Sequence, residues 1–230
     1  SGDEVARTTT EYAVGGNPVH TRTWLDLDAD RYADSYIRYD WLGRVSELVG
    51  ADETLTAFEY DVRDRVVSTW VGRDDLTAGP EIVSETFYDH ELDTGGEPVQ
   101  GVGNGNATFI RVYTGEPTGT GSLGPVKRDT IKTFDYRDRL VIQENPDSPH
   151  AAFAYDNLGR VTEAATFESV PTGIATPLAD RISYTRTSYS QRGLPYLVEQ
   201  AIDPTSSSTE YLATSTWRDV TGRAVADWAP

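Results

Sequence analysis

The sequence of 230 residues contains Tyr155-Asp156-Asn157-Leu158-Gly159-Arg160-Val161, and the pattern of these seven residues occurs three more times in the chain. The pattern is an aromatic residue, Asp, any two residues, Gly or Asp, Arg, and then Val or Leu. The four copies share these repeat positions: Tyr39, Asp40, Gly43 and Arg44; Tyr60, Asp61, Asp64 and Arg65; Phe134, Asp135, Asp138 and Arg139; Tyr155, Asp156, Gly159 and Arg160. Self-similarity of this kind is typical of a repeat architecture.

Each copy predicts a strand, a tight turn and a second strand. Apolar residues alternate before the turn, as in Phe153 and Tyr155, which is the period of a half-buried strand. Asp opens turns because its side chain can bind backbone amides two positions on. Gly and Asp share a tolerance of positive φ, so their shared slot predicts a left-handed residue after a type I turn.

The spacing predicts an all-β fold. Tyr39 and Tyr60 are 21 residues apart, as are Phe134 and Tyr155, and two strands with two turns account for that length. Hairpins are not stable alone, so successive ones are expected to pair into a long, twisted antiparallel sheet. No stretch has a sustained helical period.

Weaker copies extend the pattern, and residues 1–230 are interpreted as a single repeat region. One of them, with Gly222 and Arg223, keeps the second half of the motif. Another opens at Tyr88-Asp89 and is expected to resume at Gly105 after an insertion. A Gly/Thr-rich insertion at about 91–130 is expected to form loops around a short strand at 108–113. The predicted turns lie near 26–31, 40–44, 61–65, 89–106, 135–139, 156–160, 190–193 and 219–223.

The repeated Arg has two interpretations. It can form a structural ladder, by pairing with the repeat Asp or stacking on the aromatic residue of a neighbouring hairpin. It can also form a row of anion sites. The Asp close to each Arg neutralises it and favours the structural role.

Composition excludes several classes of function. The net charge of −17 disfavours binding to nucleic acid and to anionic membranes, and no transmembrane segment is visible. The absence of Cys rules out disulfides and Cys-ligated metals. His20, His90 and His150 do not have a metal or triad spacing, and the carboxylates of Asp26, Asp28 and Asp30 lack the Gly and Glu of a calcium loop. We therefore expect no catalytic residues, no metal, no cofactor and no membrane insertion.

The four strong copies resemble the YD-repeat family, which includes bacterial Rhs elements, the B/C components of insecticidal toxin complexes and animal teneurins. The resemblance covers roughly residues 22–228. It implies a β-sheet wound into a hollow shell, which in bacterial members encloses a C-terminal toxin. The family's self-cleavage motif, Asp-Pro-x-Gly-Leu, is not transferred, because the nearest match here, Asp203-Pro-Thr-Ser-Ser, lacks Gly-Leu.

The resemblance implies a non-catalytic scaffold in an extracellular or cell-surface protein. Its expected partners are neighbouring repeats of the parent chain and an enclosed toxin domain. The alternative is a carbohydrate-binding or adhesive module, because Tyr and Trp beside acidic residues suit sugar rings. The binding residues for such glycans are unknown.

Overall fold

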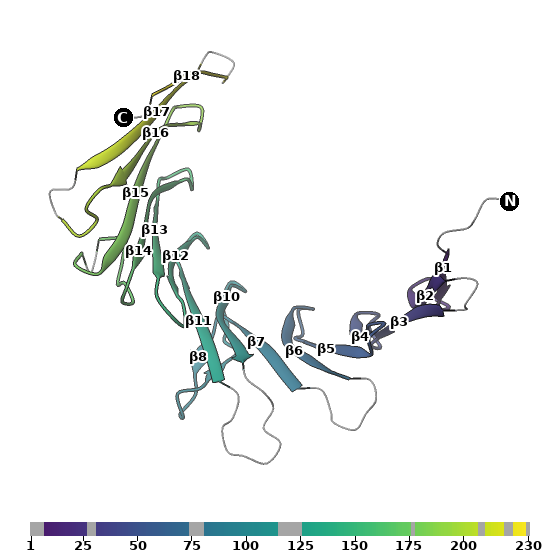
Figure 1. Ribbon diagram of the computed structural model, residues 1–230. Helices are drawn as coiled ribbons and strands as arrows, with labels where there is room; N and C mark the ends of the chain where they lie inside the picture. Colours follow the sequence, from purple (N-terminus) through teal and green to yellow (C-terminus); the bar gives the residue numbers. More distant parts are fainter. Residues whose placement is uncertain are drawn as a thin grey trace. The chain divides into compact units, whose positions relative to one another are not determined.

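A computed structural model describes residues 7–26, 31–73, 81–114, 126–175, 178–206, 210–218 and 223–228. These residues form eighteen strands and no helix, which confirms the predicted all-β class. Sixteen of the strands follow one another in chain order in an antiparallel sheet, and β8 and β9 form a separate small hairpin (Figure 1). The bounds of the first nine are β1 Arg7–Tyr12, β2 Pro18–Asp26, β3 Arg31–Tyr39, β4 Val45–Val49, β5 Thr54–Tyr60, β6 Val66–Arg73, β7 Glu81–Tyr88, β8 Glu91–Leu92 and β9 Pro98–Val99. The others are β10 Ala107–Thr114, β11 Val126–Phe134, β12 Leu140–Glu144, β13 His150–Tyr155, β14 Val161–Phe167, β15 Arg181–Tyr189, β16 Pro195–Ala201, β17 Tyr211–Arg218 and β18 Ala224–Trp228.

The repeat turns have the predicted geometry. In the turn at 156–160 the amide of Gly159 donates to the carbonyl of Asp156 over 3.1 Å, and the amide of Asp156 donates to the carbonyl of Arg160 over 3.0 Å. The register shifts between Ala154 and Tyr155, which is the bulge expected where a left-handed residue closes a hairpin. The slot residues Gly43, Asp64, Asp138, Gly159 and Gly193 all have positive φ, between 60° and 82°. The left-handed slot is therefore confirmed at every described copy.

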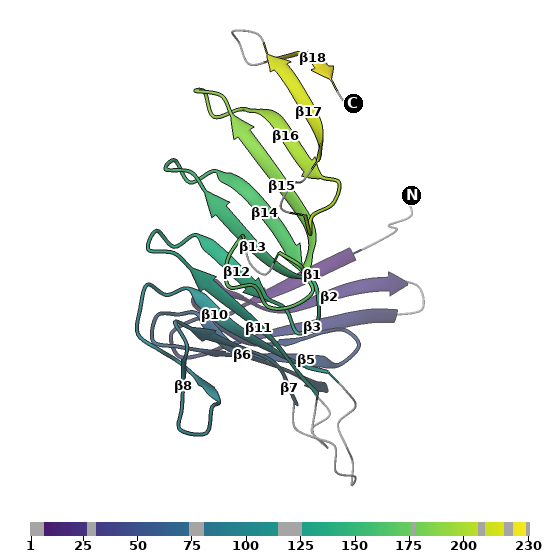
Figure 2. The same cartoon turned by 90° about the vertical axis from the view of Figure 1, so that its left-hand side faces the viewer.

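The chain separates into two compact units, one of Ser1–Thr86 with Arg111–Arg128 and one of Phe87–Ile110 with Asp129–Pro230. Whether the whole repeat region is a single domain stays a prediction. Within the second unit the strands β11 to β18 follow one another in order, and the turns at 135–139, 156–160 and 190–194 lie along one side of the strands (Figure 2). The predicted turns near 26–31 and 219–223 lie mostly outside the described residues, Gly222 included.

The buried core is small and local. In the second unit Ala152, Ala165, Phe167 and Tyr184 form a buried cluster, against which Ile174 packs from the β14–β15 connection. Phe167 is the largest fully buried side chain among the described residues. Side chains of a single-layer sheet are covered by the neighbouring strands but not by a second layer, so most strand residues stay half-buried. Contacts between neighbouring hairpins must therefore supply much of the stability.

The described residues of the region 91–130 contain more strand than a pure loop insertion would. It contains β10, which confirms and extends the expected strand at 108–113, and β11 begins within it at Val126. The short hairpin of β8 and β9 lies in the same region and closes with a turn of the repeat type, in which Asp93 accepts the amides of Gly95 and Glu97.

Candidate functional site

The repeat Asp organises its own turn. In the copy at 156–160, Oδ1 of Asp156 accepts the amides of Leu158 and Arg160 over 2.8 and 3.0 Å. Its Oδ2 accepts Nε and Nη2 of Arg160 over 2.6 and 2.5 Å. Asp40, Asp61 and Asp135 make the same four bonds. Each repeat Asp is thus both the cap of its turn and the partner of its Arg, as the structural interpretation predicts.

These bonds shift the acidity of the repeat Asp. The side-chain hydrogen bond from Arg139 lowers the pKa of Asp135 to about 2, against the opposing effect of burial. The backbone amide of Arg160 is the main cause of the lowered pKa of Asp156. Burial would raise the pKa of Asp40 and of Asp61, but hydrogen bonds from their own Arg and turn amides outweigh it, and both pKa values are lowered. The carboxylates are therefore held ionised by the turn that they cap.

The repeat Arg also reaches the next hairpin. Nη1 of Arg139 donates to the carbonyl of Asp156, the capping residue of the following copy, over 2.9 Å. The guanidinium of Arg139 lies 4.7 Å from the ring centroid of Tyr155, in the same following copy. Arg44 makes both contacts to Asp61 and Tyr60, and Arg160 makes them to Ser190 and Tyr189. The two structural contacts proposed for the Arg, pairing and stacking, therefore occur together.

The Tyr hydroxyl adds a hydrogen bond in the opposite direction, from the following copy to the preceding one. The hydroxyl of Tyr155 donates over 2.7 Å to the carbonyl of Leu140, the residue that follows Arg139. Tyr60 and Tyr189 donate to the corresponding carbonyls of Val45 and Val161 over 2.7 and 2.8 Å. We call the Asp and Arg of one copy, together with the aromatic residue of the next, a rung. A rung joins consecutive hairpins by a hydrogen bond from the Arg to a backbone carbonyl, a cation–π contact and a Tyr hydrogen bond, while the Asp–Arg ion pair within one turn holds the Arg in position.

Two copies carry Asn in the Arg slot, and the Arg-based pattern does not find the first. The turn at 13–17 has the repeat hydrogen bonds and a positive φ at Gly16, with Asn17 in the Arg slot. The hydroxyl of Tyr39 donates to the carbonyl of the next residue, Pro18, as the rung requires. The spacing of Tyr12 and Gly16, four residues apart, is the signal that could have revealed this copy.

The other Asn copy contains the insertion. The amide of Asp89 donates to the carbonyl of Asn106 over 2.8 Å, so Gly105 and Asn106 take the Gly and Arg slots, as predicted for the resumed copy. Asn104 and Asn106 both donate to Oδ1 of Asp138 over 2.7 and 3.0 Å, where Arg44 donates to Asp64 in the first unit. The insertion thus keeps a side-chain contact to the next hairpin, with two amides in place of the guanidinium, although Phe134 has no hydroxyl to complete the rung.

The Gly-rich stretch of the insertion passes directly over Asp89. A Cβ atom on Gly101 would lie 1.7 Å from the carbonyl oxygen of Asp89, and one on Gly103 would lie 2.7 Å from its carboxyl carbon. Glycine is needed at position 101 because the Asp89 backbone lies too close for any side chain, whereas at position 103 the Asp89 side chain occupies the space that a Cβ would take. Close packing, rather than phosphate binding, explains this run of glycines.

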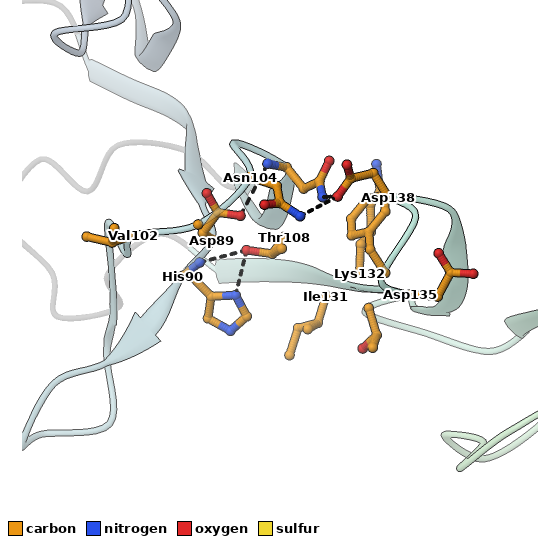
Figure 3. A pocket seen from close by; sticks show the side chains of 13 residues that line it. Asp89, His90, Val102, Asn104, Thr108, Ile131, Lys132, Asp135 and Asp138 are labelled. Carbon is orange, nitrogen blue, oxygen red and sulfur yellow. Dashed lines mark hydrogen bonds between the residues drawn. The ribbon is translucent and has the colours of Figure 1, made fainter.

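A pocket of about 420 Å³ lies beside the insertion (Figure 3). Its polar lining is largely paired within the protein: Asn104 with Asp138, and Nδ1 of His90 with the Thr108 hydroxyl over 2.9 Å. Burial lowers the pKa of His90. The apolar lining comes from Val102, Ile131 and Phe134. The pocket is in the size range of small-molecule sites. The hydrogen bonds of its lining residues, however, stabilise the turn.

The remaining sequence candidates are not brought together. Within the described ranges, no group of three His, Cys, Asp or Glu residues could hold a metal ion. Asp28 and Asp30 of the calcium-like stretch lie outside those ranges, as does Gly222, whereas Arg223 is described and exposed. His20, His90 and His150 lie in β2, after β7 and in β13. The part of the chain that is described contains no helix able to cross a membrane.

Comparisons with known proteins give weak structural likenesses. No family model matches the chain, and no curated protein matches it. The crystal structure of TcdB2-TccC3-Cdc42 is similar at 16% identity with a TM-score of 0.40, over 96% of this chain and 12% of that one. The Tc holotoxin pore of Photorhabdus luminescens, with the TccC3 mutation D651A, is similar at 16% identity with a TM-score of 0.41, over the same shares. The chain therefore spans about an eighth of the length of those chains, and likenesses this weak support no conclusion about function.

Proposed function

We propose that this chain is a non-catalytic structural scaffold, a segment of the wall of a YD-repeat shell that encloses or presents another domain. The single observation that supports the proposal is the rung, which recurs with the same partners between consecutive hairpins. The rung engages the ionisable side chains of the motif: Asp binds within its own turn, and Arg and Tyr make the contacts between repeats. Such a design extends a sheet by adding identical units, which is what a wall requires.

The proposal includes the setting of the parent protein. We place the chain in an extracellular or cell-surface protein whose partners are neighbouring repeats and an enclosed domain. The rung supports the first of these partners, neighbouring repeats, because every rung is completed only by an adjacent hairpin. An enzyme or lectin would instead need polar groups left unpaired for its ligand.

Insertion of one extra repeat tests the scaffold function. A second copy of residues 135–155 is placed after Tyr155, which adds two turns and two strands in the register of the rung, because the repeat length is 21 residues. The expected variant is folded, has more strand signal in circular dichroism, and melts at or above the wild-type temperature. The control carries the same 21 residues in scrambled order and is expected to lose stability.

Two results would count against the scaffold. Unfolding of the repeat-insertion variant to the same extent as the scrambled control would show that the hairpins are not interchangeable units. Selective binding of the wild-type chain on a glycan array would support the carbohydrate-binding alternative instead.

A further inference from the structure

Each repeat Arg that contacts the next hairpin is surrounded by the same groups of the motif. These are the carboxylate of its own capping Asp, the ring of the next aromatic residue and the carbonyl of the next capping residue. Around Arg44 the groups come from Asp40, Tyr60 and Asp61. Oδ1 of Asp64, in the slot of the next turn, adds a second carboxylate at 2.6 Å from Nη1 of the Arg. This guanidinium therefore contacts two carboxylates, a carbonyl and an aromatic ring.

The insertion copy has the same surroundings without a guanidinium, because Asn106 takes its Arg slot. The corresponding positions are the capping Asp89, the next aromatic Phe134, the next capping Asp135 and the next slot Asp138. All four line the pocket of about 420 Å³ beside the insertion (Figure 3), and every lining residue belongs to the second unit. The pocket therefore lies where a repeat Arg would place its guanidinium.

The pocket carries a net negative charge. Asp135 is neutralised by its ion pair with Arg139. Asp89 and Asp138 instead accept hydrogen bonds from neutral backbone and Asn amides, and among the described residues neither has a basic partner within ion-pair distance. Lys132 is the one Lys or Arg in the lining, and within the described ranges it forms no ion pair either. Two unpaired carboxylates therefore outweigh one ammonium group and favour a cation in the pocket.

We propose that this pocket binds the guanidinium group of an arginine side chain presented by a partner protein. A guanidinium is planar, donates in pairs to carboxylates and stacks on aromatic rings, so it matches Asp89, Asp138 and the ring of Phe134 together. An ammonium group has neither the paired donors nor the planar face. The net charge of −17 also favours encounter with a basic partner. The inference does not rest on the scaffold function, because the same pocket would bind Arg in an independent domain.

The other copy with Asn in the Arg slot shows that an absent Arg does not by itself create such a site. Asn17 takes that slot, but the capping residue is Ala13 and the slot residue of the next turn is Gly43. Neither position carries a carboxylate, so of the binding groups only a carbonyl and the ring of Tyr39 remain. Asn17→Arg and Asn106→Arg are therefore matched substitutions, of which only the second places an internal guanidinium between two carboxylates.

Titration of the nitrogen-15-labelled full chain with a blocked tripeptide, Arg between two Gly residues, tests this inference by NMR. The control peptide has Lys in place of Arg. We expect saturable shifts of the amides at residues 104–108 and 132–138, with an affinity that weakens as salt is raised, and about threefold weaker binding of the Lys peptide. Asn106→Arg should weaken binding of the Arg peptide about tenfold or more, because its own side chain fills the pocket. Asn17→Arg should leave this binding unchanged.

Asp138→Asn tests the site without adding a larger side chain. Asp138 has a φ of 60°, a conformation that Asn tolerates, so the turn should persist while the carboxylate is lost. Binding of the Arg peptide should again weaken about tenfold, because a charge-assisted hydrogen bond is removed. This variant decides the question if Asn106→Arg loses strand signal in circular dichroism.

Three results would overturn the inference. These are the absence of saturable shifts at the pocket residues, equal affinity for the Arg and Lys peptides, and undiminished binding by a folded Asn106→Arg or Asp138→Asn variant. The repeat-insertion variant leaves residues 89–138 unchanged, so it reports on the scaffold separately.

Discussion

Replacing Tyr155 by Phe removes one defined element of a rung. The hydroxyl donates over 2.7 Å to the carbonyl of Leu140 between half-buried groups, while the ring stays in place over Arg139. A neutral hydrogen bond of this kind contributes about 0.5–1.5 kcal/mol net. We therefore expect Tyr155→Phe to lower the free energy of unfolding by about 1 kcal/mol, which corresponds to a melting temperature about 2–4 °C lower for a chain of this size.

The opposite substitution can be made at another copy of the motif. Phe134 is the natural Phe in the aromatic slot, and Ala107 follows Asn106 in the position that Leu140 has in the next copy. Phe134→Tyr should therefore raise stability by up to about 1 kcal/mol if the hydroxyl finds this carbonyl. Tyr136→Phe is the control, because that side chain is 83% exposed at a turn tip, and its effect should be within about 0.5 kcal/mol.

Urea denaturation of the three variants, with unchanged m-values, measures these differences. A loss for Tyr136→Phe as large as for Tyr155→Phe would exclude the rung as the source of the stabilisation, because the loss of any hydroxyl would then have the same effect.

Further predictions concern the turns and the insertion. Gly159→Val should cost about 1–3 kcal/mol in urea denaturation while Gly159→Asn is nearly neutral, because the residue has φ +82° although a Cβ would meet nothing within 4 Å; equal stabilities would exclude backbone strain as the cause. Arg139 binds Asp135 and lowers the pKa of its carboxyl group to about 2, below the value of about 3.9 in unfolded chains. The stabilising effect of the ionised Asp135 is therefore complete above about pH 4 and is lost as the pH falls through about 2. Melting temperatures from pH 5 to pH 2 should therefore fall, and less steeply in Asp135→Asn; an identical slope would contradict this. Gly101→Ala should disrupt the insertion, since its Cβ would clash with the Asp89 carbonyl. Amide exchange at residues 90–106 should then be faster than in the control variant Gly173→Ala, where a Cβ meets nothing within 4 Å.

Much of the local structure could be predicted from the sequence. The strand, the turn and the left-handed slot depend on residues within about seven positions of each other, and the alternation of Gly and Asp at the slot shows the backbone conformation directly. The pairing of Arg160 with Asp156 is also local. The resumed copy at Gly105 could be placed because Gly and Asn keep the turn chemistry across the insertion.

The contacts between hairpins could not be predicted in the same way. That Arg139 reaches the Asp156 carbonyl, or that Tyr155 binds the Leu140 carbonyl, depends on the register and twist of adjacent strands. The pattern does not find the copy at 13–17 because it requires Asp and Arg, where this copy has Ala13 and Asn17, whereas the turn needs only a residue whose carbonyl accepts the first amide. The pocket beside the insertion likewise depends on how residues 90–104 fold back over Asp89.

We infer that rungs couple each hairpin to the next. A double-mutant cycle with Arg139→Gln and Tyr155→Leu tests it most directly, with Arg139→Gln and Tyr189→Leu as the reference pair, since Tyr189 belongs to the next rung and stacks under Arg160. We predict that the Arg139–Tyr155 double variant is clearly less destabilised than the sum of its single variants, while the reference pair is additive. Additivity in both cycles would contradict the account, because Arg139 and Tyr155 would then be neighbours without being coupled.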